Sequence, residues 1–445
     1  MPARKNGAPE GNAGFRSYHW NAKACLLFLP LWSVPYSLSF FYLSLYLREF
    51  GVSDSQLGLL VTAGAGASIL FSLLSAPIVD SIGRKRATLW FDLAGSVLPF
   101  LVYAVSGSFV FALVGTLLSN ANKILSVGYY LLMTEDSVNS EKAASFNIFN
   151  IVVIASGILV PIAGSLVERL GVVPAERWFL VLSALSMTVS ALGRNHFAVE
   201  TSTGLRLMGR HAARPRGRFF EIRNLAEPYR KALSYLGSNK VAAAAVAANV
   251  LFYVFYIVGT NNSLYFAPFF HDALGMNPTM VSVIGAVFSG GTLLAMLFLN
   301  PHLFRRLSPA ACALLGGMLT AAGYLPLLFI ARGGFAWALA SVTLSSLGYG
   351  ILKSAIDASL ATCFGEAGER SGNLKGEEGR AGVYSVANLF SSVLGMGAGA
   401  LCGLVYPDAP RSIPLISVII LVAICVILGY AEITACQSAD TRLRS

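Results

Sequence analysis

Long apolar segments alternate with short polar turns along the whole chain. An α-helix needs about 20 mostly apolar residues to cross the core of a bilayer, and these segments reach that length. The pattern therefore predicts an all-α membrane protein with twelve transmembrane helices. We expect them at residues 24–48, 54–79, 88–107, 109–134, 143–167, 176–197, 240–267, 277–300, 309–331, 335–362, 381–406 and 412–435.

Composition narrows the class of protein. Of the 445 residues, 55% are hydrophobic and only 12% are Asp, Glu, Lys or Arg, whereas soluble domains carry about 25% charged residues. This excludes a soluble enzyme, a disordered chain and a fibrous protein. The sequence has no G-x-x-x-x-G-K-[ST] phosphate loop, and its five histidines lie in tails, in loops or at helix ends. We therefore expect no enzyme activity, no cofactor and no metal site.

Basic residues are divided unequally between the two sides of the predicted membrane. With the N-terminus placed in the cytoplasm, 25 of the 32 Lys and Arg residues fall in inside segments and five in outside segments. This is the bias that orients membrane proteins, so the net charge of +10 indicates topology rather than a nucleic-acid partner. We expect a multi-pass protein of a bacterial cytoplasmic membrane, with both termini in the cytoplasm.

The two halves of the chain repeat each other. A shift of 224 residues aligns Gly51 with Gly275, and a later shift of 238 residues aligns Asn150 with Asn388. We expect the basic linker between the halves to be a solvated tether, with an amphipathic helix on anionic lipid as the alternative. The predicted parts are a cytoplasmic tail (1–23), an N-terminal six-helix bundle (24–198), the cytoplasmic linker (199–239), a C-terminal six-helix bundle (240–436) and a second cytoplasmic tail (437–445).

The turn between the second and third predicted helices carries a recognisable motif. The segment that starts at Ala76, A-P-I-V-D-S-I-G-R-K-R, resembles the pattern G-x-L-x-D-R-x-G-R-R of the major facilitator superfamily, with Asp80, Gly83 and Arg84 at matching positions. Ala76 and Ser81 replace a Gly and an Arg of that pattern. The resemblance implies a secondary transporter built from two pseudo-symmetric six-helix bundles.

The same resemblance implies a gate on the cytoplasmic side. In the family's arrangement, the residue at the Asp80 position faces the N-terminus of the eleventh helix, where the helix dipole is positive and where Arg380 lies in this sequence. Arg84 is placed to pair with an acid at the end of the fourth helix. The predicted gating residues are Asp80, Gly83, Arg84, Glu135, Asp136 and Arg380.

Two predicted helices carry ionisable residues at membrane depth. Lys123 is 14 residues into the fourth helix and shares one polar stripe with Asn120. Such groups are costly in a bilayer and usually face a cavity or a partner, so we expect Lys123 to face a cavity and attract an anionic solute. On the tenth helix, Lys353 and Asp357 are four residues apart. They form either a structural intrahelical ion pair or, if the pair opens during transport, a proton site at Asp357.

In the family, helices 1, 4, 7 and 10 line a central cavity, and the polar stripes of this sequence agree with that arrangement. Asp357 is the predicted proton-coupling residue. The predicted substrate-binding residues are Tyr36, Ser37, Asn120, Lys123, Asn249, Tyr253, Tyr256, Tyr349, Lys353 and Asn388.

Together these features predict a secondary transporter that works by alternating access, coupled to protons, with a preference for an anionic or carboxylate-bearing solute. One alternative is an efflux pump for amphipathic compounds, and another is a ligand sensor on a transporter fold. The expected partners are a small-molecule substrate, membrane lipids and a proton or other coupling ion. We expect the protein to be a monomer.

Overall fold

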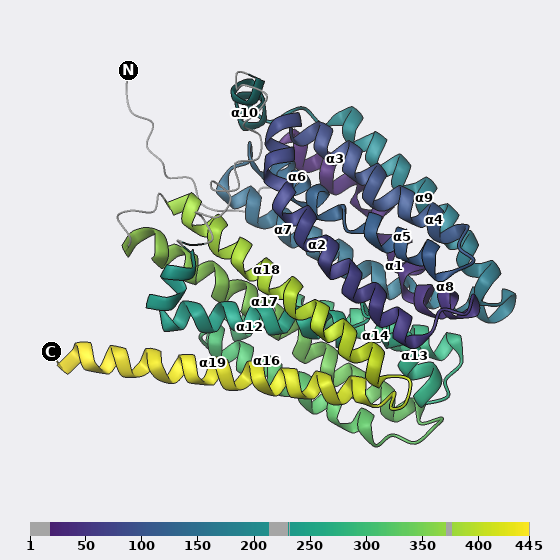
Figure 1. Ribbon diagram of the computed structural model, residues 1–445. Coiled ribbons are helices and arrows are strands. Elements are labelled where there is room, and N and C mark those ends of the chain that lie inside the picture. The colour runs from purple at the N-terminus through teal and green to yellow at the C-terminus, as the bar shows by residue number, and fades with distance from the viewer. Residues whose placement is uncertain (1–17, 213–229, 231, 371–375, 445) are drawn as a thin grey trace.

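The computed structural model describes residues 18–212, 230, 232–370 and 376–444. Within these residues, twelve helical segments are long and apolar enough to cross a bilayer, which confirms the predicted all-helical class. They form two bundles that lie side by side, one from each half of the chain (Figure 1).

The N-terminal bundle contains six spans, three of which are interrupted. Its helices are α1 (Trp20–Glu49), α2 (Asp54–Ile82), α3 (Arg84–Asp92) continued by η2 (Leu93–Val97) and α4 (Leu98–Ala104), α5 (Phe109–Ser119) with α6 (Asn122–Thr134), α7 (Asn139–Ser156) continued by η3 (Gly157–Leu159) and α8 (Val160–Leu170), and α9 (Val172–Phe197). Helix α10 (Ser202–Ala212) follows.

The C-terminal bundle contains the other six spans. Its helices are α12 (Lys240–Gly259), the short α13 (Phe266–Pro268) with η4 (Phe269–Ala273), α14 (Pro278–Leu294) continued by η5 (Ala295–Leu299) and α15 (Asn300–Leu303), α16 (Pro309–Tyr324) with η6 (Leu325–Leu328), α17 (Phe335–Arg370), α18 (Gly376–Val405) and α19 (Ser412–Arg444).

Local sequence sets several helix ends. The α1–α2 turn passes through Gly51 at φ 77°, a conformation that favours glycine, and Ser53 then forms a capping box with Gln56 at the start of α2. The second half repeats this turn, because Gly275 has φ 67° and Asn277 caps α14. The 224-residue repeat thus extends to backbone conformation.

Several predicted helix boundaries are wrong, among them those of the first, seventh and last helices. Helix α1 begins inside the predicted N-terminal tail, because the His19 side chain caps it at Asn21, and α19 continues through the predicted C-terminal tail. The helix predicted at 240–267 ends at Gly259, because Thr260 adopts an extended backbone (φ −88°, ψ 173°).

The fourth span is not the continuous helix that the sequence predicted. It is interrupted between α5 and α6, where the amides of Asn120 and Ala121 bond three residues back, to Leu117 and Leu118. The Asn120 side chain donates to the Thr116 carbonyl (Nδ2–O 2.8 Å). This bond satisfies a backbone acceptor at the interruption.

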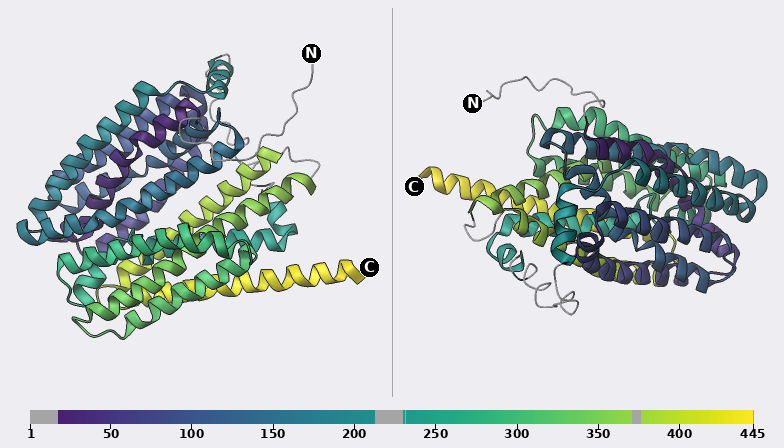
Figure 2. Two further views of the ribbon diagram at one scale, coloured as in Figure 1. Left: turned by 180° about the vertical axis from the view of Figure 1, so that it is seen from behind. Right: turned by 90° about the horizontal axis from the view of Figure 1, so that it is seen from above.

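The two bundles meet at one end and diverge toward the other. We call the end with the start of α1 and the end of α19 the terminal face, and the end with residues 50–53, 260–277 and 406–411 the far face. The bundles pack through α2 against α18 and through α8 against α14. They separate toward the terminal face (Figure 2).

The segment after α9 is docked on the N-terminal bundle rather than free, so the prediction of a solvated tether is wrong for its described part. Asn21 and Val199 exchange hydrogen bonds of 3.0 and 2.9 Å. The Glu200 carboxylate accepts from the amides of Arg84 (2.9 Å) and Lys85 (3.0 Å). Glu200 therefore acts as an N-terminal cap of α3, where free amides and the helix dipole favour a carboxylate.

Replacing Glu200 with alanine is expected to lower the stability of the protein by about 1 kcal/mol, the usual effect of losing an N-terminal cap. Thermal unfolding of the purified protein measures this change. The matched control is Glu49→Ala, which removes an exposed acid for which the structure shows no hydrogen bond within its described residues. Equal unfolding midpoints for the two variants would show that the cap is not stabilising.

Candidate functional site

Lys123 lies in the first turn of α6, directly after the interruption of the fourth span. The amides of Lys123 and Ile124 donate to the Asn120 and Ala121 carbonyls, each at 3.0 Å, so the start of α6 has few free donors for a ligand. The Lys123 side chain is half-buried. No carboxylate of the described residues lies within ion-pair distance of its ammonium group. The ammonium group is therefore the source of positive potential at this depth of the fourth span.

The Lys123 side chain points toward the other bundle. Its Nζ lies 5.5 Å from the centroid of the Tyr253 ring on α12, within the range of a cation–π contact. Tyr256, one turn further along α12, has its ring centroid 6.3 Å from that of Tyr253. A residue from the N-terminal bundle and two from the C-terminal bundle thus form one cluster between the halves.

Aromatic rings on α1 form the opposite wall of this cluster. The rings of Trp32, Tyr36 and Phe40 stack in sequence, with centroids 5.1 and 5.2 Å apart and interplanar angles of 11°. Tyr36 is also close enough to Tyr253 and Tyr256 to interact with them electrostatically. The wall is a stacked row of aromatic rings.

Lys353 and Asp357 form an ion pair on α17, with Nζ and Oδ2 3.0 Å apart. The Asp357 side chain is 55% exposed, although it lies within the chain's tenth span, near the end at Ser359. It interacts electrostatically with Tyr130 of α6, so it faces the N-terminal bundle. The pair seen in this state is the intrahelical one.

The other predicted substrate-binding residues fall into two groups. Ser37, Asn249 and Asn388 are half-buried or exposed and form no hydrogen bond with the described residues. Tyr349 is 5% exposed, and its ring stacks on Phe252 at 5.6 Å inside the C-terminal bundle. The first group is free to contact a solute, whereas the ring of Tyr349 is not.

The motif residues form an ionic network at the terminal face. Arg84 lies 2.9 Å from Asp80 (Nη1–Oδ1) and 2.9 Å from Glu135 (Nη2–Oε1). The Thr201 hydroxyl donates to the same Glu135 carboxylate at 2.5 Å. The Ser202 hydroxyl donates to Asp136 at 2.7 Å, so Asp136 holds the segment that follows α9.

Gly83 is required by two features of this network. Its φ is 91°, a conformation that side chains disfavour. A Cβ at this position would also lie 2.4 Å from the Glu200 carboxylate and 2.6 Å from Met208 Sδ. The backbone of Arg380 belongs to α18, but its side chain lies outside the described residues, so the predicted contact of Asp80 with this end of α18 stays a prediction.

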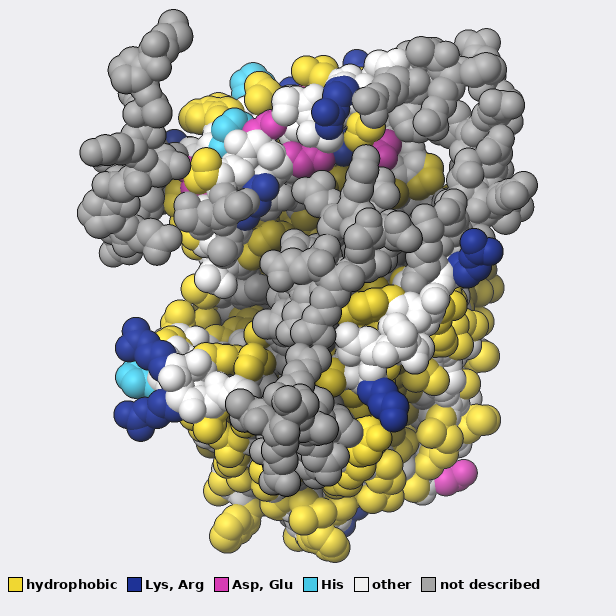
Figure 3. Space-filling model, turned by 90° about the vertical axis from the view of Figure 1, so that its left-hand side faces the viewer, with side chains coloured by type: hydrophobic (Ala, Val, Ile, Leu, Met, Phe, Trp, Pro, Cys, Tyr) yellow, Lys and Arg dark blue, Asp and Glu magenta, His cyan; other side chains and the backbone are white. Residues whose placement is uncertain are grey.

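The terminal face carries basic side chains on both bundles (Figure 3). The described ones include Lys85 and Arg86 on the N-terminal bundle and Arg305 and Arg306 on the C-terminal bundle. Within the described residues, no hydrogen bond or ion pair joins the two bundles at this face.

The far face contains the cluster that sequence reasoning missed. Arg48 of α1 lies 2.6 Å from Asp272 of η4 (Nη1–Oδ2) and 3.3 Å from Asp54 of α2 (Nε–Oδ1). The Tyr406 hydroxyl donates to the same Asp272 oxygen at 3.1 Å. Burial tends to raise the pKa of Asp272, but hydrogen bonds from His271 and Arg48 and the charge of Arg48 outweigh it, so its pKa is below the ordinary value.

The far-face contacts follow the internal repeat. Arg48 and Asp272 are separated by 224 residues, so each is the repeat equivalent of the other, and equivalent residues touch only near a two-fold axis. Tyr42 donates to the Pro278 carbonyl at 2.5 Å, and Tyr265 donates to the Asp54 carbonyl at 3.1 Å. The two acceptors, Asp54 and Pro278, are repeat equivalents, whereas the donors are one position out of register, because Tyr42 aligns with Phe266. The repeat offset contained the signal for this cluster, because it aligns Arg48 with Asp272.

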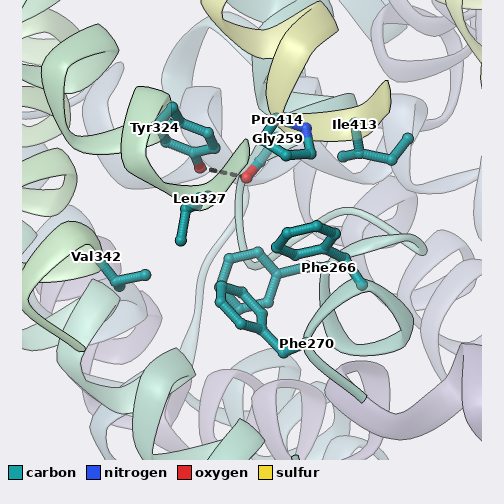
Figure 4. Close-up of a pocket in the computed structure, with 9 residues that line it drawn as sticks. Gly259, Phe266, Phe270, Tyr324, Leu327, Val342, Ile413 and Pro414 are labelled. Carbon is teal, nitrogen blue, oxygen red and sulfur yellow. Dashed lines mark hydrogen bonds between the residues drawn. The ribbon is translucent and has the colours of Figure 1, made fainter. Parts of the chain in front are cut away.

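A small apolar pocket lies inside the C-terminal bundle (Figure 4). The Tyr324 hydroxyl donates to the Gly259 carbonyl beside it, and phenylalanines of α13 and η4 form one wall. No charged side chain of the described residues lines this pocket. It is therefore part of the bundle core and does not belong to the cluster around Lys123.

Comparison with family models assigns the fold. The model of the Major Facilitator Superfamily matches residues 31–400, which cover most of the chain. The chain belongs to the Major Facilitator Superfamily. It is an integral, multi-pass membrane protein with the fold of a secondary transporter, and this family indicates a transporter rather than an enzyme.

Solved structures of this superfamily share the fold at low sequence identity. A point mutant of the nucleoside transporter NupG is 12% identical, with a TM-score of 0.66 over 93% of this chain and 100% of that one. A bacterial homologue of the human lysosomal transporter Spinster, inward-facing and unoccupied, is 15% identical, with a TM-score of 0.67 over 95% and 98%. The xylose transporter XylE from E. coli, partially occluded and inward open, is 11% identical, with a TM-score of 0.66 over 92% and 97%. Comparison with curated protein sequences gave no match.

Proposed function

We propose that this protein is a proton-coupled secondary transporter that binds a small anionic solute between its bundles and moves it by alternating access. The single observation that carries the proposal is the Lys123 ammonium group. It reaches toward the opposite bundle and has no acidic partner within the described residues.

A balance of charges around Lys123 supports a monoanionic solute. The charged residues within the fourth and tenth spans are Lys123, Lys353 and Asp357. Lys353 is neutralised by Asp357 at 3.0 Å, which leaves one positive charge. An unpaired charge at membrane depth is costly, and a carboxylate-bearing solute would compensate it.

Proton coupling is assigned to Asp357. The carboxylate is paired with Lys353, but its side chain is more than half exposed, so a proton can reach it. Protonation would break the ion pair and free Lys353 to bind the solute anion. Proton binding and solute binding would then favour each other, as symport requires.

The unequal closure of the two faces supports alternating access. The far face is closed by contacts between the bundles, and the bundles separate toward the terminal face (Figure 2). The basic residues of the terminal face support a cytoplasmic location for it, with both termini in the cytoplasm of a bacterial cell. In this orientation the state is inward-facing, and Asp80, Gly83, Arg84 and Glu135 belong to the gate that closes next. The protein is proposed to act as a monomer.

Replacing Lys123 with glutamine is expected to weaken the binding of the anionic solute about 10-fold, because a hydrogen bond to a charged group contributes about 1.5 kcal/mol or more. Thermal stabilisation of the purified protein by a panel of organic monoanions identifies the ligand, and uptake into proteoliposomes measures transport. Lys240→Gln is the matched control, because Lys240 is exposed at the start of α12. Unchanged affinity in Lys123→Gln would refute charge recognition.

The stacked rings on α1 favour a second candidate, an efflux pump for amphipathic compounds. Trp32, Tyr36 and Phe40 form an aromatic row that would contact the apolar part of such a compound. The variant Tyr36→Ala, which lacks the Tyr36 ring, distinguishes the efflux pump from the anion transporter. An efflux pump would lose most of its affinity for neutral or cationic aromatics, whereas the proposed anion transporter would bind them weakly in either form.

A further inference from the structure

One acidic residue of the N-terminal bundle has no role in the proposed cycle. Glu176 lies near the start of α9, is 0% exposed, and neither oxygen of its carboxyl group has a hydrogen-bond partner among the described residues. A charged carboxylate that is buried without a cation or a donor is strongly unfavourable. The geometry therefore requires a bound proton in this state.

The groups around Glu176 do not neutralise it. The titratable or charged side chains that the elements packed on α9 present near this position are Tyr42, Tyr46, Tyr103, Glu168 and Arg177. Asp92 of α3 also faces α9, but it pairs with Arg194 near the opposite end of that helix.

Each of these groups is engaged elsewhere. Arg177 contacts the Tyr46 hydroxyl and the Ser106 carbonyl, each at 3.5 Å, and its guanidinium lies 5.4 Å from the Phe50 ring centroid. The Tyr46 hydroxyl donates to the Tyr103 carbonyl at 2.9 Å. The Tyr103 hydroxyl pairs with Thr116, and Glu168 accepts from Thr279 of the other bundle.

Tyr42 connects Glu176 to the closure of the far face. Its hydroxyl is close enough to interact electrostatically with Glu176, yet it donates its hydrogen to the Pro278 carbonyl of the C-terminal bundle at 2.5 Å. When the far face opens, Pro278 departs with that bundle. The hydroxyl then has no acceptor there and becomes available to the carboxyl group.

We propose that Glu176 is a proton-binding site that couples pH to the closure of the far face, an inference that rests on the proposed alternating access. Opening breaks the O–H bond of the Glu176 carboxyl group, the proton passes to water, and the carboxylate keeps the electron pair and accepts the hydrogen bond of Tyr42. Closing takes up one proton. Lower pH therefore favours the closed far face.

Distances across the far face test this coupling. Spin labels on cysteines at the exposed positions Val105 and Phe329, one on each bundle, report closure between pH 5 and pH 8. A His271→Gln background removes an exposed histidine at this face. We expect the ratio of closed to open protein to fall by up to about 10-fold per pH unit, the limit for one proton.

Three variants decide the outcome. Glu176→Gln is expected to stay closed at every pH, because it mimics the protonated acid, whereas Glu49→Gln, an exposed acid at the same face, titrates like the parent protein. Tyr42→Phe lowers the closed fraction at low pH, where only the closed state loses a hydrogen bond. It also moves the pH dependence to higher pH, because the open-state Glu176 carboxylate loses its donor. A pH-independent ratio in the parent protein, or an unaltered pH dependence in Glu176→Gln, would overturn the proposal. Because this measurement needs no substrate, failure of the anion-transport proposal would leave its result interpretable.

Discussion

A leucine in place of Gly58 is expected to abolish transport, with a loss of about 100-fold or more. A Cβ at this position would lie 2.5 Å from the Gly403 Cα and 2.7 Å from the Gly399 carbonyl oxygen. Both are backbone atoms of α18, so no side-chain rotation can relieve the clash. Overpacking of this kind costs about 1–3 kcal/mol or more.

The effect is specific to one state of the cycle, because Gly58 and Gly403 belong to different bundles. The clash destabilises the closed far face and leaves the open one unaffected, so the population shifts toward the open state. Spin-label distances across the far face measure the shift, and proteoliposome uptake measures the loss of transport. Gly397→Leu is the matched control, because a Cβ at Gly397 meets nothing within 4 Å. Wild-type transport by Gly58→Leu would show that α2 and α18 need not pack this closely.

The transmembrane spans could be predicted from the sequence because each of them must be apolar where it contacts lipid. Apolar length is required wherever a helix crosses a bilayer, whatever it packs against. The interruption at Asn120 lacked such a signal, because no Pro or Gly marks it. The interruption lies where the third span packs closely against the fourth, since a Cβ on Gly95 would be 2.8 Å from the Asn122 amide nitrogen. Tertiary packing, and not local propensity, sets this feature.

The candidate site was predictable only in part, because its contacts also depend on tertiary packing. Lys123 is conspicuous in an apolar segment, but its contact with Tyr253 depends on how the bundles face each other. Glu176 stands at the edge of a predicted helix, where an acid is unremarkable, and only its complete burial sets it apart. Arg48 and Asp272 look like ordinary loop charges until the repeat aligns them.

Removing either partner of the Arg48–Asp272 pair is expected to reduce transport by roughly 30-fold to 150-fold. The two side chains are 29% and 25% exposed, so each substitution leaves a partly buried charge without its partner, at a cost of about 2–3 kcal/mol. Arg48→Ala leaves Asp54 and Asp272 facing each other, and their repulsion adds to the opening of the far face. Uptake into proteoliposomes and far-face distances are the measurements.

A double-mutant cycle separates this pair from its neighbours. If Arg48 acts through Asp272, Arg48→Ala combined with Asp272→Ala loses less than the sum of the single losses, with a coupling of about 1–3 kcal/mol. Because the pKa of Asp272 lies below its ordinary value of 3.8, its carboxylate stays charged from pH 5 to pH 8, and the pair weakens only as pH falls toward that lowered value. The coupling is therefore expected to be constant over this range. Additive losses would exclude Arg48 and Asp272 as a gate, and a coupling that disappears between pH 5 and pH 8 would indicate a titrating group other than Asp272.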